Sequence, residues 1–104
     1  MSENKFVHVV NFWLKKDIST EDRQKFEREA KTLAQVESLI YFNLGMPAST
    51  DRPVIDRSYD FCLLTVFENE AGHDIYQMHP VHLKFVENCK ALWEKVLIYD
   101  SETV

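Results

Sequence analysis

Two segments of the sequence carry apolar side chains at nearly every position. Phe6–Leu14 is FVHVVNFWL and residues 59–67 are YDFCLLTVF, and both are rich in β-branched and aromatic residues. Because successive side chains of a strand point to opposite faces, each segment presents apolar groups on both faces. The sequence therefore predicts two strands that are covered on both sides.

Two further segments complete a set of four strands. Residues 39–46, LIYFNLGM, alternate in the period of two that a strand requires, and residues 93–99, WEKVLIY, are rich in strand-forming side chains. Between the second and third strands, residues 47–58 contain two prolines and many polar residues. We expect a loop there that is longer than a tight hairpin needs.

A helix is expected after the first strand. Residues 18–22, ISTED, place Ser19 where it can cap free backbone amides, and the two acids follow in the first turn, where the helix dipole favours negative charge. Phe26, Ala30 and Leu33 then recur at i, i+4 and i+7. This spacing indicates a surface helix with one buried stripe.

A second helical region follows the third strand, and we expect it to be broken in two. Residues 69–77 form the first piece, and Pro80 suits the first position of the next one. The second piece has an apolar face at helical spacing, made of Val81, Phe85, Cys89 and Leu92.

The predicted order is strand, helix, strand, strand, broken helix, strand. This is the α+β, ferredoxin-like βαββαβ arrangement, with a four-stranded antiparallel sheet and helices on one face. We expect a single domain over residues 1–104. Helices on one face leave an apolar sheet face open, and a second copy of the chain is its commonest cover, so we expect a homodimer.

Composition and charge exclude several classes of protein. The net charge is -5 and the sequence pI about 5.3, without a basic stripe, which argues against a nucleic-acid partner. We expect no membrane span, because the apolar segments are too short, and a cytoplasmic location. Cys62 and Cys89 form no CxxC motif and are expected to be reduced, buried thiols.

One stretch of the chain resembles a known family. Tyr-x-x-His-Pro-x-His over residues 76–82, preceded by the third strand and followed by Phe85, is similar to the core pattern of the stress-responsive A/B barrel (Dabb) family. The first strand and the last, over residues 93–100, resemble that family's outer segments. The resemblance covers nearly the whole chain.

The resemblance implies a dimeric α+β barrel with a cavity between the helices and sheet of each chain. Most members have no assigned activity. In a plant polyketide cyclase of the family, which catalyses an aldol condensation followed by aromatisation, the catalytic residues fall on Tyr76 and His82, and a pocket histidine falls on His8. That enzyme has a further pocket histidine where this chain has Phe61. The ligand-contacting set implied here is His8, Phe26, Leu63, His79, Trp93 and Asp100.

The residues themselves allow acid and base chemistry. His82 is the third residue of a helix that starts at Pro80, where the dipole disfavours imidazolium, so a neutral histidine able to act as a base is expected. Tyr76 is placed to polarise a carbonyl oxygen, and Asp100 to orient an imidazole. Structural roles are the alternative for each of these residues, Tyr76 as a core aromatic and His82 bonded to the backbone.

No metal or cofactor is expected. His79 and His82 are three apart, but no third ligand stands at a fixed spacing from them. The first functional hypothesis is a protein that binds a small apolar or aromatic molecule, with Tyr/His acid–base chemistry. The second is a non-catalytic stress-response or interaction protein. The third is a haem or quinol monooxygenase-like protein, with Asn11 and Trp13 on the first strand as its candidates.

Overall fold

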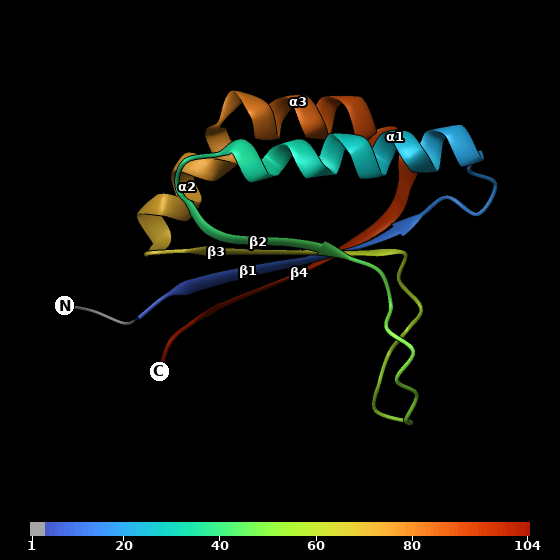
Figure 1. Cartoon of the computed structure of the whole chain (residues 1–104), viewed down its shortest axis with the longest axis horizontal. Helices are drawn as coiled ribbons and strands as arrows, with labels where there is room; N and C mark the ends of the chain where they lie inside the picture. Colours follow the sequence, from blue (N-terminus) through green and yellow to red (C-terminus); the bar gives the residue numbers. More distant parts are fainter. Residues whose placement is uncertain (1–3) are drawn as a thin grey trace.

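The computed structural model describes residues 4–104, and residues 1–3 of the polar N-terminal segment lie outside it. Three helices cover one face of a four-stranded sheet, and the opposite face carries no helix (Figure 1). In chain order, the elements are β1 (Phe6–Leu14), α1 (Thr20–Lys31), the 3₁₀ turn η1 (Thr32–Gln35), β2 (Leu39–Gly45), β3 (Phe61–Phe67), α2 (Glu70–Met78), α3 (Pro80–Cys89), the 3₁₀ turn η2 (Lys90–Leu92) and β4 (Trp93–Glu102). The ferredoxin-like prediction is confirmed.

The two strands with apolar residues on both faces are the central ones. The strand order is β2-β3-β1-β4, and β1 pairs with β3 and β4, antiparallel in each case. β3 begins at Phe61, two residues later than the sequence predicts. Asp60, just before β3, is instead fixed to the end of β1 and to α1. Its carboxylate accepts hydrogen bonds from the Leu14 amide at 2.7 Å and from Arg23 at 3.2 Å.

Local capping explains where the helices begin. The Ser19 hydroxyl accepts from the Asp22 amide at 3.0 Å, and the Asn69 side chain accepts from the Gly72 amide at 3.0 Å. His79 separates α2 from α3, and its Nδ1 accepts from the Val81 amide at 3.1 Å, directly before the proline that starts α3. The break between the two helices is therefore specified by residues 79–81.

The core lies between the helices and the sheet. Phe26 from α1 is fully buried and packs against Phe12 of β1, with ring centroids 5.0 Å apart, and against Phe85 of α3 at 5.6 Å. Ala30 and Leu33 are also fully buried, as the helical spacing predicts.

No helix within residues 4–104 has the length and apolar character needed to cross a membrane.

The other face of the sheet is apolar and open. Val9 of β1 and Leu64 of β3 lie opposite each other and are partly exposed, while Tyr41 and Tyr99 on the outer strands are 55% and 61% exposed. The long loop between β2 and β3 extends on this side of the sheet, away from the helices (Figure 1). The sheet therefore has one face covered by helices and one face that is partly exposed.

Candidate functional site

A cavity of about 170 Å³ lies on the helix-covered side of the sheet. Four polar residues contribute to its wall: His8 from β1, Tyr76 and Gln77 from α2, and His82 from α3. The apolar part of the wall is formed by Val10, Phe12, Leu63, Phe85, Val86, Trp93, Val96 and Ile98. A mostly apolar cavity with a few convergent polar groups is the usual form of a small-molecule site.

Tyr76 and His82 lie side by side in this wall, with ring centroids 4.8 Å apart. The break at residues 79–81 produces this arrangement, because it turns the first turn of α3 back toward the last turn of α2. Tyr76 is 1% exposed, and burial raises its pKa well above the usual range. Its hydroxyl has no hydrogen-bond partner among residues 4–104, so its proton is available to a bound molecule.

The hydrogen bond made by His82 defines which of its nitrogens is basic. Nδ1 lies 3.1 Å from the backbone carbonyl oxygen of Gln77, and a carbonyl oxygen only accepts. Nδ1 therefore carries the proton, and in the neutral ring Nε2 carries the lone pair. Burial lowers the pKa of His82, an effect that the Gln77 carbonyl opposes and that nearby His8 and His73 reinforce. The site thus favours a neutral imidazole with a free base nitrogen.

A second group of polar side chains adjoins the first. His8 is 3% exposed, and its Nδ1 lies 2.5 Å from Oδ1 of Asp100 on the neighbouring strand β4. His73 of α2 lies above them, with its ring centroid 4.5 Å from that of His8 and stacked on Phe6 at 4.6 Å. Burial lowers the pKa of His73, and the neighbouring His8 adds to that effect.

A sequence profile identifies the family. The profile of the stress responsive A/B barrel domain, Dabb, matches residues 6–103 of the chain. The chain belongs to the Dabb family. A Dabb protein with a ferredoxin-like fold from Mesorhizobium loti is similar in structure, with 27% identity, a TM-score of 0.76, and coverage of 95% of this chain and 96% of that one. No curated protein matches the chain significantly.

Two structures with lower sequence identity show the same fold. A dimeric ferredoxin-like protein of unknown function from Bacteroides fragilis has 19% identity and a TM-score of 0.74, covering 95% of this chain and 96% of that one. A hydroxynitrile lyase from Passiflora edulis has 16% identity and a TM-score of 0.78, covering 96% and 94%. One fold therefore occurs in a protein without an assigned function and in an enzyme.

Only part of the ligand-contacting set expected from the sequence lines the cavity of about 170 Å³. His8, Leu63 and Trp93 line it together with Tyr76 and His82. The other three lie outside its lining. Phe26 is fully buried behind Phe12 and Phe85 in the core, His79 Nε2 is 3.1 Å from Glu37 at the α2–α3 junction, and Asp100 contacts His8 rather than His82.

Asn11 and Trp13 lie on the opposite face of the sheet from the cavity. They line a separate hollow of about 130 Å³ on the open face. The Trp13 indole donates to the Ser58 hydroxyl at 3.1 Å, and the Lys95 ammonium lies 4.4 Å from its ring centroid. Trp13 thus anchors the base of the long loop, and the monomer does not bring it together with Tyr76 or His82.

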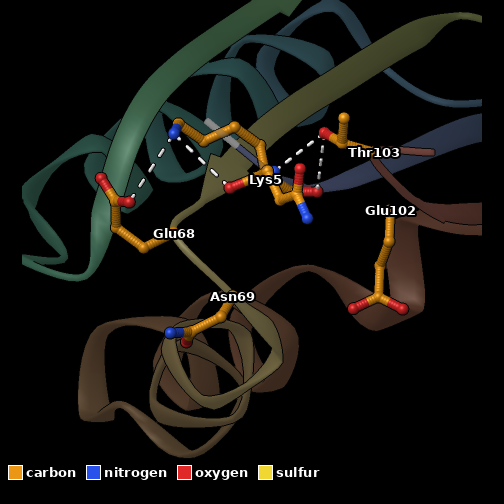
Figure 2. A pocket seen from close by; sticks show the side chains of 6 residues that line it. Lys5, Glu68, Asn69, Glu102 and Thr103 are labelled. Carbon is orange, nitrogen blue, oxygen red and sulfur yellow. Dashed lines mark hydrogen bonds and ion pairs between the residues drawn. The ribbon is translucent and has the colours of Figure 1, made fainter. Parts of the chain in front are cut away.

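A larger, polar hollow of about 490 Å³ lies where the described ends of the chain meet (Figure 2). Its groups bond to one another: the Lys5 ammonium lies 3.7 Å from Glu68, and the Lys5 amide donates to the Thr103 hydroxyl at 2.8 Å. Glu68 and Glu102 are solvent-exposed. Despite its size, this hollow has few apolar groups and no histidine or tyrosine, so the smaller cavity is the better candidate site.

Two residues of the site were absent from the sequence-based set. His73 precedes Tyr76 by three positions on α2, and Gln77 follows His73 by four, so all three lie close together on the helix. The signal that would have found His73 is this spacing from Tyr76. The role of Gln77 comes from its backbone carbonyl, which has no sequence signature.

Proposed function

We propose that this Dabb protein is a cytoplasmic homodimer that binds a small aromatic or otherwise apolar molecule, with Tyr76 and His82 as an acid–base pair. The observation that supports this most strongly is the pairing of the two rings, with centroids 4.8 Å apart, in the wall of one mostly apolar cavity, where His82 contacts the Gln77 carbonyl through Nδ1. A purely structural tyrosine and histidine would be expected to use their polar atoms on the protein itself.

The size of the cavity restricts the ligand. A cavity of roughly 150 Å³ lined by apolar side chains holds a benzene ring in other proteins. At about 170 Å³, this cavity suits one ring with a small substituent, or the open-chain diketone that would form such a ring. Typical drug-sized pockets are about 300–1,000 Å³, so a larger ligand must extend past edge strand β4, where Ile98 is 48% exposed.

The arrangement supports removal of a proton next to a carbonyl group. The Tyr76 hydroxyl donates a hydrogen bond to the carbonyl oxygen, and its raised pKa keeps the hydroxyl protonated. His82 Nε2 takes the proton from the adjacent carbon, so the C–H bond breaks, an N–H bond forms, and the electron pair moves to the oxygen as an enolate. Attack of that enolate on a second carbonyl in the same molecule is a cyclase-like aldol step.

The open sheet face supports the homodimer. Val9, Leu64 and Val66 form its partly exposed centre, and Leu97 and Tyr99 continue it along β4. Apolar surface of this kind is usually covered by a partner. The dimeric state of the similar ferredoxin-like proteins from Bacteroides fragilis and Thermobifida fusca also favours it. The free thiols Cys62 and Cys89 are in keeping with a reducing cytoplasm.

A ligand-binding experiment tests the proposal. Monocyclic phenols, aryl ketones and cyclic 1,3-diketones are added to the pure protein, and unfolding is followed by calorimetry. A ligand at about 100 times its Kd raises the free energy of unfolding by about 2.7 kcal/mol. Tyr76→Phe removes only the hydroxyl, and His82→Asn removes Nε2 while keeping a donor for the Gln77 carbonyl. Both variants should lose most of the ligand-induced shift.

His79→Asn is the matched control, because asparagine keeps the capping acceptor of α3 and the residue lies outside the cavity lining. It should respond to ligand like the wild type. The proposal fails if no compound of these classes stabilises the wild type. It also fails if Tyr76→Phe and His82→Asn bind as well as the control, since the cavity would then have no polar role.

A further inference from the structure

Three side chains with metal-ligating atoms converge beside the cavity, and the proposed ligand-binding role uses none of them as acid or base. One nitrogen each from His8 and His73 and one carboxylate oxygen of Asp100 all lie within 4.8 Å of one another. They come from β1, α2 and β4, which the fold brings together at one end of the sheet. We propose that His8, His73 and Asp100 form a binding site for a divalent transition metal such as Zn²⁺.

The set of donors fits such an ion. Two imidazoles and a carboxylate are a common arrangement for zinc and for non-haem iron, and they leave further coordination positions for water or a ligand. Zn–N and Zn–O bonds are about 2.0–2.2 Å long, so ligand atoms around a tetrahedral ion stand about 3.3 Å apart. The three donor atoms lie within 4.8 Å of one another, so side-chain rotations that adjust this spacing would build the site.

The three proposed ligands differ in how freely their side chains can move. His8 and His73 are held in place, since both are buried and their rings pack against each other. Asp100 is the adjustable ligand, because its side chain is 41% exposed and is held by its contact with His8. The Gln77 side-chain amide lies 3.0 Å from Nε2 of His73. With the amide oriented so that its oxygen accepts a hydrogen bond from Nε2–H, Nδ1 of His73 keeps a lone pair for an ion.

The proposed metal site adjoins the cavity, so an ion there could interact with a bound molecule. His8 belongs both to the cavity wall and to the three-residue cluster. An ion held by these three residues would lie next to the cavity and could attract a carbonyl, phenolate or carboxylate oxygen of a molecule bound there. The proposal rests on the three donors and stands independently of the ligand-binding role of Tyr76 and His82.

Zinc titration of the full chain tests the site. Protein treated with EDTA and then freed of the chelator is titrated with ZnCl₂ in a calorimeter, and with CoCl₂ while visible absorption is recorded. We expect one ion per chain and, for Co²⁺, ligand-field bands of a nitrogen and oxygen site. His73→Phe keeps the ring that stacks on Phe6, and Asp100→Asn keeps the size of an exposed side chain, so neither change should disturb the fold.

Each of these two variants should weaken Zn²⁺ binding by at least about tenfold, which is the lower range for loss of even an indirect metal partner. His79→Asn, which removes a histidine outside the cluster, should bind zinc like the wild type. The proposal is overturned if the wild type binds no zinc, or if His73→Phe and Asp100→Asn bind it as tightly as His79→Asn does. Organic ligands tested on metal-free protein report separately on Tyr76 and His82, so failure of one proposal leaves the other standing.

Discussion

The two faces of the sheet are built from the same strands but differ in how far their side chains are buried. On the helix-covered face, Phe12, Leu63 and Phe67 are buried to 5% exposure or less, and the remaining space is a small cavity with polar groups in its wall. On the open face, Val9 and Leu64 are partly exposed, and Tyr41 and Tyr99 on the outer strands are 55% and 61% exposed. The helix-covered face is buried within one chain, whereas the open face is the proposed dimer interface.

The largest effect should come from a charge on the open face. In Leu64→Glu each protomer of the proposed homodimer would bury an unpaired carboxylate, at a cost of about 3–5 kcal/mol each. We expect the wild type to have twice the 12.3 kDa chain mass by light scattering and the variant to have the single-chain mass, with an unchanged circular dichroism spectrum. A wild type at the single-chain mass would refute the dimer.

A truncation on the other face should destabilise the chain itself. Phe26→Ala removes a fully buried ring from the aromatic core and should lower the free energy of unfolding by about 3–5 kcal/mol. The matched control is Tyr41→Ala, because Tyr41 lies on the open face, whereas its neighbour Phe42 lies on the helix-covered face. The control is measured in the Leu64→Glu background, where the proposed dimer does not form. Urea unfolding should show a much smaller loss for Tyr41→Ala. Equal losses would mean that the two faces are not different in packing.

The reactivity of the two cysteines tests the two sides of the sheet separately, because Cys62 lies on the open face and Cys89 on a covering helix. Cys62 is half-buried on the open face, whereas Cys89 is fully buried, and burial raises the pKa of Cys89 to about 11. In a thiol-labelling experiment, Cys62 should react faster in Leu64→Glu than in the wild type, because the partner no longer covers it. Cys89 should react only after unfolding in both proteins. Equal labelling of Cys62 in the two proteins would speak against a covered face.

The smallest effect concerns pH and the helix-covered face. The folded-state pKa of His82 lies below its unfolded value of about 6.5, so below pH 6.5 the unfolded chain binds more protons than the folded one. Stability should therefore be highest above pH 6.5 and fall as the pH is lowered through the range between the two pKa values. Urea unfolding of His82→Asn should show a weaker decline, and an identical decline would contradict the buried neutral histidine.

Much of the fold was predictable because it depends on local patterns. The β-branched and aromatic residues of Phe6–Leu14 identify β1, and the spacing of Phe26, Ala30 and Leu33 identifies the buried side of α1 and η1. Pro80 marks the helix break, and with it the return of α3 toward α2. These features need only the periods of strands and helices and the chemistry of proline.

The candidate site was less predictable because it depends on long-range register and on the backbone. Asp100 meets His8 only because β4 pairs with β1 in a register that places them opposite each other, 92 positions apart in the sequence. The tautomer of His82 depends on the carbonyl of Gln77, and any residue at that position would supply one. His79 looked like a site residue from its motif, but its two nitrogens serve the start of α3 and Glu37.

The most direct test of the central claim is the protonation state of His82. Two-dimensional NMR of protein with ¹⁵N-labelled histidine distinguishes a protonated ring nitrogen from one with a lone pair, and His82→Asn identifies the signals. At pH 7 the account predicts a neutral His82 with the proton on Nδ1 and a bare Nε2 that shifts when a monocyclic phenol is added. A charged ring, a proton on Nε2, or no response to any such ligand would contradict it.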